Sequence, residues 1–117
     1  MNILSIILQV ILGLGFLMFG FMKFGSKQMV ESFKHFGYPG WFRIFTGLIE
    51  VISAILVTAG IWDETLAAWG SLIIVITMLG AILTHIKIND NVKQMMLPII
   101  LFIMGLAVLL INFDQLI

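Results

Sequence analysis

Glu50 is the residue of this chain whose position most needs a chemical explanation. It lies in a long apolar stretch, seven residues after Arg43. If the stretch is helical, seven residues make two turns, so both side chains leave the same face and Glu50 lies about 10 Å deeper than Arg43. A lone carboxylate at that depth in a membrane costs several kcal/mol. We therefore expect Glu50 to have a charged partner, a proton or a function.

Three basic residues are expected at one level above Glu50. Lys23 ends the first apolar stretch, Arg43 begins the second and His85 ends the third. If these stretches cross a membrane as neighbouring helices, the three ends meet at one membrane face. Because ionisable groups inside a membrane usually serve a function, we predict a polar pocket that opens at this face. Its ligand-binding residues are predicted to be Lys23, Arg43, Glu50 and His85, and the sequence assigns a catalytic role to no residue.

Each of these four residues also has a purely structural explanation. Lys23 and Arg43 can extend their charged ends to lipid phosphates, and His85 can cap its helix at the interface. Glu50 is too deep to reach the surface in this way. It can instead form a buried ion pair with Arg43, Lys23 or His85, or stay protonated and bond to a neighbouring helix. Both uses of Glu50 stay open from the sequence.

Composition excludes several other kinds of chemistry. There is no cysteine, which removes disulfides, thiolate metal sites and thiol nucleophiles. His35 and His85 are not placed to face each other within apolar stretches, so a haem held by both is not expected. A metal site needs three or four ligands, and Glu50 with one or two histidines falls short of that number unless Asp90 joins them. The net charge is +0 and there is no basic tract, so nucleic acid is not an expected partner.

The elements that position these residues are predicted to be apolar helices. Of 117 residues, 62% are hydrophobic and 10% are charged, and the mean hydropathy is +1.19. Soluble domains are about 45–50% apolar and about 25% charged. About 20 apolar residues cross a bilayer, and they must be helical because lipid offers the backbone no hydrogen bonds. We predict a single all-α domain over residues 1–117, a polytopic membrane four-helix bundle with spans at about 3–22, 41–61, 65–84 and 95–113.

A short amphipathic helix is expected between the first and second spans. Ser26 suits a helix N-cap. Met29, Phe33 and Phe36 follow at spacings of four and three residues, on the side opposite the charged residues. This pattern is typical of a helix that lies at the membrane surface.

The basic residues predict an orientation in the membrane. All of them lie in or beside the first and third connections, namely Lys23, Lys27, Lys34, Arg43, Lys87 and Lys93. By the positive-inside rule, these connections face the cytoplasm and both termini of this multi-pass cell-membrane protein lie outside. No Lys or Arg precedes Lys23, so we expect the first span to be retained rather than removed as a signal peptide.

Several short motifs occur in a recognisable order. The first span ends in G-x-x-K, from Gly20 to Lys23, and a Tyr/Pro/Gly turn precedes the second span. The second span contains G-x-x-E, from Gly47 to Glu50, and Gly60 follows it. A histidine ends the third span. In order and spacing, over about residues 8 to 111, the chain resembles the DoxX family of small bacterial four-helix membrane proteins.

The resemblance implies an accessory or subunit role in quinone-linked redox or oxidative-stress metabolism. The family takes its name from a subunit of a thiosulfate:quinone oxidoreductase, and other members are associated with quinone or catechol detoxification. By this likeness, Lys23, Glu50 and His85 form a quinone or small-molecule site. The chain has no cysteine and no cofactor motif of its own. A redox role therefore needs a bound quinone or a membrane or soluble oxidoreductase as partner, and whether the chain belongs to an enzyme stays open.

Two other functions also fit the sequence. A structural or assembly protein would use an ion pair at Glu50 to fix helix register, and would act through partners or through further copies of itself. A small proton-coupled multidrug-type transporter also has four spans and one intramembrane glutamate. That glutamate lies in the first span of such transporters, however, and basic residues around Glu50 would repel a cationic substrate.

Overall fold

Helices account for nearly all of the chain in the computed structural model, which describes residues 2–117. The long helices are α1 (Ile3–Gly25), α3 (Gly40–Ala59), α4 (Glu64–Lys87) and α5 (Val92–Ile111). The shorter α2 (Lys27–Phe36) joins α1 to α3, and a 3-10 turn, η1 (Phe113–Leu116), follows α5. No strand occurs in the described range. The prediction of an all-α fold with a short helix between the first two spans is confirmed.

The four long helices are each long and apolar enough to cross a membrane. The chain is therefore a multi-pass membrane protein. The helices overrun the predicted spans at one end, because α4 continues to Lys87 and α5 begins at Val92. His85 consequently lies inside the last turn of α4, and Pro98 lies inside α5 rather than at its start.

Side-chain caps explain where the helices begin. The side chains of Asn2, Ser26, Asp63 and Asn91 each accept a hydrogen bond from a main-chain N–H in the first turn that follows. These N–H groups have no partner within the helix, so short polar side chains are preferred at this position. At the end of α2, Gly37 adopts the left-handed conformation with φ 85°, which glycine adopts without a steric cost.

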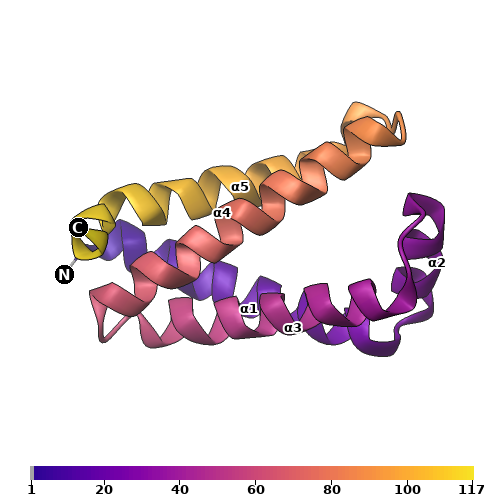
Figure 1. The fold of residues 1–117 in the computed structure, drawn as a ribbon. Coiled ribbons are helices and arrows are strands. Elements are labelled where there is room, and N and C mark those ends of the chain that lie inside the picture. Colours follow the sequence, from indigo (N-terminus) through magenta and orange to yellow (C-terminus); the bar gives the residue numbers. More distant parts are fainter. Residues whose placement is uncertain (1) are drawn as a thin grey trace.

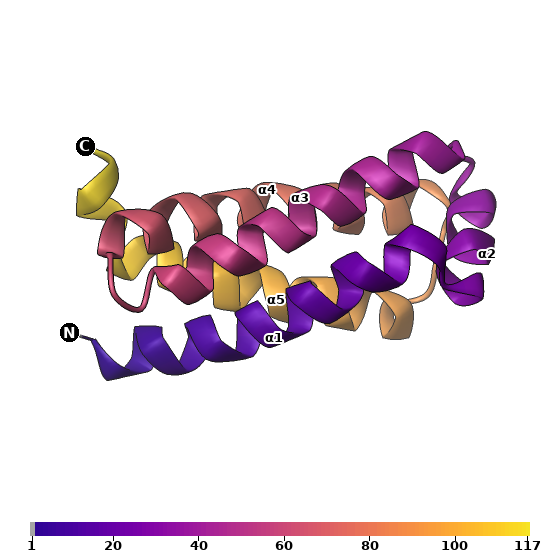
Figure 2. The same ribbon diagram turned by 90° about the horizontal axis from the view of Figure 1, so that it is seen from below.

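The helices form two antiparallel pairs that meet at one end of the molecule. Helix α1 packs along α3, α4 packs along α5, and α3 and α4 hold the pairs together. Figure 1 shows the two pairs close together at the end that carries both termini and spread apart at the end that carries α2. Helix α2 lies across that open end, as Figure 2 also shows from below. A space between the pairs is therefore covered at one end by α2.

The apolar core lies between the pairs on the side of the termini. Leu12, Phe16, Val57, Ile74 and Val108 have no exposed surface. They come from all four long helices and belong to one continuous buried cluster. Most other large apolar side chains are exposed on the outside of the bundle, as expected for a protein whose surroundings are lipid.

A buried polar network that was not predicted from the sequence joins three helices near the termini. The Gln9 amide nitrogen donates to the main-chain oxygen of Val57 at 2.9 Å, and its oxygen accepts from the Ser5 hydroxyl at 2.7 Å. Asn112, at the end of α5, donates to Ser5 at 3.1 Å. Gln9, Ser5 and Asn112 are all buried, so α1, α3 and α5 are tied together inside the bundle by polar bonds.

Candidate functional site

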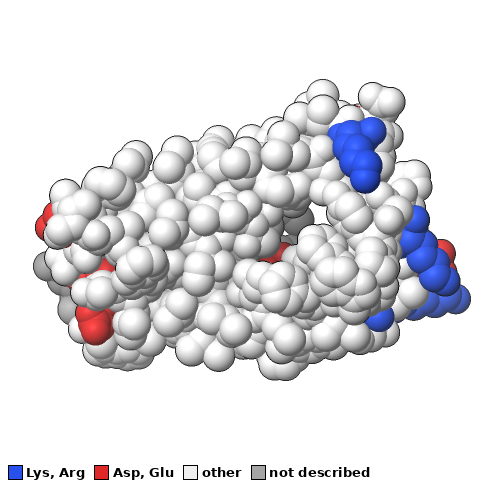
Figure 3. Space-filling view, in the orientation of Figure 1, with Lys and Arg blue, Asp and Glu red and all other residues white. Residues whose placement is uncertain are grey.

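A cavity of about 610 Å³ lies between the two helix pairs near α2. All five α-helices contribute to its wall. The space-filling view in Figure 3 shows a hollow on the side of the molecule, with acidic atoms inside it. Among residues 2–117, Glu50 is the only acidic residue in the wall of the cavity. Much of the rest is aromatic, including Phe19, Phe33, Phe36, Phe42 and Phe45, so the cavity is apolar with a charged group inside it.

That charged group is an ion pair between Lys23 of α1 and Glu50 of α3. Lys23 Nζ lies 2.8 Å from Glu50 Oε1, and the side chains are 12% and 3% exposed. Oε1 is fully buried, and Lys23 supplies the positive charge that lies against it. Glu50 therefore has the charged partner that its depth requires, and this partner is Lys23 rather than Arg43 or His85.

The close approach of α1 and α3 explains this pairing. A Cβ atom on Gly20 would lie 2.9 Å from the main-chain oxygen of Gly47, and one on Gly47 would lie 2.8 Å from that of Gly20. Only residues without a side chain fit at this contact. Lys23 and Glu50 each follow one of these glycines by three residues. Because side chains lean toward the N-terminus of their helix, in two antiparallel helices these two lean toward each other.

Arg43 has a different position from the one predicted. Its guanidinium donates a hydrogen bond to the main-chain oxygen of Lys23. This oxygen belongs to the last turn of α1, where carbonyl groups have no partner within the helix. Arg43 is not among the residues that line the cavity. Of the four predicted site residues, the structure therefore brings Lys23, Glu50 and His85 to one cavity and places Arg43 behind its wall.

His85 lies in the wall of the cavity and pairs with Asp90. His85 Nδ1 is 2.7 Å from Asp90 Oδ2. The chain turns back between the two residues because Asn89 adopts the left-handed conformation with φ 56°, and the Asp90 N–H donates to the His85 main-chain oxygen. With Nδ1 donating to the carboxylate, Nε2 is the ring nitrogen left for another partner. The pairing of Asp90 with His85 was not predicted, because five residues separate them and the turn at Asn89 brings them together.

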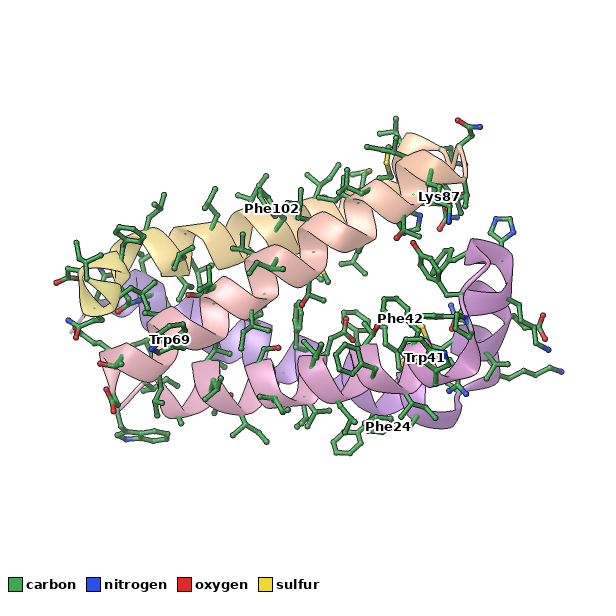
Figure 4. The ribbon with its side chains drawn as sticks, in the orientation of Figure 1. Phe24, Trp41, Phe42, Trp69, Lys87 and Phe102 are labelled. Carbon is green, nitrogen blue, oxygen red and sulfur yellow. The ribbon has the colours of Figure 1, made fainter. Side chains whose placement is uncertain are left out.

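Tyr38 bridges the open ends of the two helix pairs. Its hydroxyl is 2.9 Å from the Thr84 hydroxyl, and Lys87 Nζ lies 5.0 Å from the centre of its ring. The rings of Phe36 and His85 meet edge to face at 5.6 Å between centroids. In Figure 4, Lys87 extends from the end of α4 toward the corner between α2 and α3. These side-chain contacts connect the end of α4 to α2 and to the turn before α3 across the open end.

The two polar pairs consequently lie at different depths in the cavity. His85 and Asp90 lie near the start of α3, beside Tyr38. Glu50 lies ten residues along α3 from Gly40, which corresponds to about 15 Å of helix. The Lys23–Glu50 pair forms the inner end of the cavity and His85 lies at the outer end.

Charged residues are separated along the length of the molecule. Figure 3 shows Lys and Arg at the end that carries α2, and Asp and Glu mainly at the opposite end. The outer end of the cavity therefore lies in the basic half. Across residues 2–117, no three side chains of His, Asp or Glu gather in a group that could hold a metal ion.

Comparison with known proteins gives one family and one relative. The family described as the DoxX-like family matches residues 7–108, which include all four long helices in whole or in large part. A protein of Bacillus subtilis (strain 168) described as uncharacterized protein YdgD is 36% identical over 83 residues, which cover 70% of this chain and 73% of that protein. No solved structure matches the chain.

Proposed function

The chain belongs to the DoxX-like family, and we propose that it binds a lipid-soluble small molecule of the quinone type inside the membrane. In this role it is an accessory or subunit of quinone-linked redox or oxidative-stress metabolism. The observation that carries the proposal is the cavity near α2, whose wall is mainly apolar and aromatic and whose inner end holds the Lys23–Glu50 pair. Ligand sites usually combine apolar walls with a few well-placed polar groups.

The features of this cavity suit a quinone head group. Aromatic side chains offer flat faces on which a ring can pack. A quinone oxygen is a hydrogen-bond acceptor, and Lys23 at the inner end supplies donors. The hollow opens on the side of the bundle that faces lipid (Figure 3). A molecule dissolved in the bilayer would therefore reach the cavity without passing through water.

The proposal includes an orientation and a partner. The basic end, with α2 and the turn between α4 and α5, faces the cytoplasm, in accord with the positive-inside rule. The outer end of the cavity, with His85, then lies at the cytoplasmic face. Because the chain has no cysteine and no cofactor motif of its own, electrons come to a bound quinone from a membrane or soluble oxidoreductase.

A binding titration tests this function. The full chain is placed in lipid nanodiscs and titrated with a short-chain ubiquinone, with empty nanodiscs measured in parallel to correct for partitioning. We expect Lys23→Met/Glu50→Met, which removes the Lys23 donor without leaving an unpaired buried charge, and His85→Ala to weaken binding by about ten-fold or more, the effect of losing one well-made polar contact. Thr58→Ala is the matched control, because Thr58 lies on α3 outside the wall of the cavity. Unchanged binding in both site variants would refute the site assignment.

A structural or assembly role is the second candidate, and the Lys23–Glu50 pair itself favours it. A buried ion pair can specify how two helices align without binding anything. In that case Glu50→Gln lowers the abundance of the protein in the membrane, and the quinone titration shows no binding to the wild-type chain. Quantitative immunoblotting of membranes beside the titration separates the two functions.

A further inference from the structure

The Lys23–Glu50 pair keeps unused hydrogen-bonding capacity inside the cavity. A carboxylate offers about four acceptor positions and a lysine ammonium offers three donors. Glu50 Oε1 is fully buried against Lys23, and within residues 2–117 no hydrogen bond is made to the other carboxylate oxygen, Oε2. Among residues 2–117 Lys23 is the polar partner of the Glu50 carboxylate, and the Lys23 ammonium makes no further polar contact. The inner end of the cavity therefore presents one acceptor and one donor side by side.

A hydroxyl group is the small group that uses both. Its oxygen accepts from the Lys23 ammonium and its hydrogen is donated to the Glu50 carboxylate. A carbonyl oxygen, as in an oxidised quinone, accepts from Lys23 but has no hydrogen to donate to Glu50. The carbonyl oxygen and the carboxylate oxygen then face each other as two acceptors. A buried carboxylate left without a donor carries a large desolvation cost. The pair is thus complementary to a hydroxyl and only half complementary to a carbonyl.

We propose that the cavity selects lipid-soluble aromatic hydroxyl compounds, which are phenols and the reduced quinol forms, over the corresponding carbonyl or ether compounds. This inference rests on the proposed function, because it concerns the ligand class of the same cavity. The aromatic walls hold the ring, the Lys23–Glu50 pair holds the hydroxyl, and the side opening leaves room for an apolar tail toward the lipid. The selectivity comes from the hydrogen that the ligand donates to Glu50.

A matched pair of ligands isolates that hydrogen. Para-nonylphenol and its methyl ether share the ring, the tail and the accepting oxygen, and differ in the donated hydrogen. Each is titrated against the full chain in nanodiscs, with empty nanodiscs as the partition control. We expect the phenol to bind the wild-type chain about ten-fold or more tightly than the ether, as for other sites whose buried polar group loses its partner.

Two variants separate hydrogen bonding from the extra bulk of the methyl group. In Glu50→Gln, the charged acceptor becomes a neutral amide, and the preference for the phenol should fall to about three-fold or less. The double variant Lys23→Met/Glu50→Met removes both charges, so it leaves no unpaired buried charge that would unfold the chain. It should bind phenol and ether alike. A preference that persists unchanged in the double variant overturns the inference, because the bulk of the ether would then explain it.

The failure of this inference differs from the failure of the proposed function. If the wild-type chain binds phenol, ether and ubiquinone equally well, and all three weaken in Lys23→Met/Glu50→Met, the cavity is a ligand site without the proposed selectivity. If none of the three binds, the proposed function and the selectivity both fail.

Discussion

Lys23 and Glu50 show how a costly charge is accommodated inside a membrane protein. Each would be unstable alone in an apolar environment, and together they neutralise each other at 2.8 Å. Removing one partner of a buried pair leaves the other unpaired, which costs about 3–5 kcal/mol, whereas replacing both with apolar residues is often close to neutral. The energetic role of the pair is therefore measurable separately from its role toward a ligand.

A double-mutant comparison measures this role. We expect Lys23→Met to lower the free energy of unfolding by about 3 kcal/mol, and Lys23→Met/Glu50→Met to stay within about 1 kcal/mol of the wild-type value. The measurement is denaturant unfolding in mixed micelles. Lys34→Met is the matched control, since Lys34 is exposed on α2 and its loss should change little. A double variant as unstable as the single one would show that the pair stabilises the fold beyond neutralising its own charges.

The sequence predicts that Glu50 needs a charged partner, and the structure shows that this partner is Lys23. The depth of Glu50 follows from helix geometry, so its need for a partner was predictable. The choice of Lys23 over Arg43 was not, because it depends on the contact between Gly20 and Gly47 and on the opposed lean of the two side chains. Pairing of His85 with Asp90 depends on a turn whose conformation the sequence does not specify.

Helices α1 and α3 cap each other at both ends of their contact. Arg43, near the start of α3, donates to the Lys23 carbonyl at the end of α1. Gln9, near the start of α1, donates to the Val57 carbonyl at the end of α3. Terminal carbonyls have no helical partner, and lipid cannot hydrogen-bond to them. The reciprocal capping therefore stabilises this pair where water is scarce.

Loss of one cap should be measurable. We expect Gln9→Leu to lower the free energy of unfolding by about 1–3 kcal/mol, because the Val57 carbonyl and the Ser5 hydroxyl each lose a buried partner. Thermal unfolding in nanodiscs provides the measurement. Gln94→Leu is the control, since Gln94 is exposed and its side chain is not used in a hydrogen bond within the described chain. Equal effects of the two substitutions would contradict a stabilising role for the network.

Hydropathy predicted that the four spans exist, but it placed some of their ends incorrectly. A hydropathy pattern stops at the first cluster of polar residues, whereas a helix continues until a cap or a turn ends it. Helix α4 therefore runs past His85 until Asn89 turns the chain, and α5 begins behind the Asn91 cap. The buried network of Gln9 was also not predicted, since the position of a single polar residue in an apolar stretch does not indicate which carbonyl group it will bond to in the folded bundle.

The whole molecule has one closed and one open end. Both termini and the apolar core lie at the closed end, and the basic residues, α2 and the cavity lie at the open end (Figures 1 and 3). The basic residues and the cavity therefore lie toward one end of the long axis of the bundle, and the tightly packed core lies toward the other. The proposed orientation places the open end at the cytoplasm.

Labelling in cells tests the orientation directly. The natural chain has no cysteine, so single cysteines can be introduced without removing others. We expect a membrane-impermeant maleimide to label Asp114→Cys in intact cells, or in spheroplasts if an outer membrane blocks access. Lys34→Cys should be labelled only after the membrane is permeabilised. Both positions are exposed, and the cysteine-free parent is the control for background. The reverse pattern would place the open end and its cavity outside.

The two helix pairs contact each other near the α3–α4 turn and diverge from there toward the open end. A small change in the distance between α3 and α4 near this turn therefore becomes a larger change in the distance between the pairs at the open end, where the proposed ligand would enter. Gly70 lies at the contact between α3 and α4, and a Cβ atom on it would be 2.7 Å from Cγ1 of Val57. Gly70→Ala should therefore widen the entrance and shift the midpoint of the quinone titration, although neither residue lines the cavity. If the cavity binds a ligand as proposed, the spacing of α3 and α4 far from the cavity then contributes to its affinity.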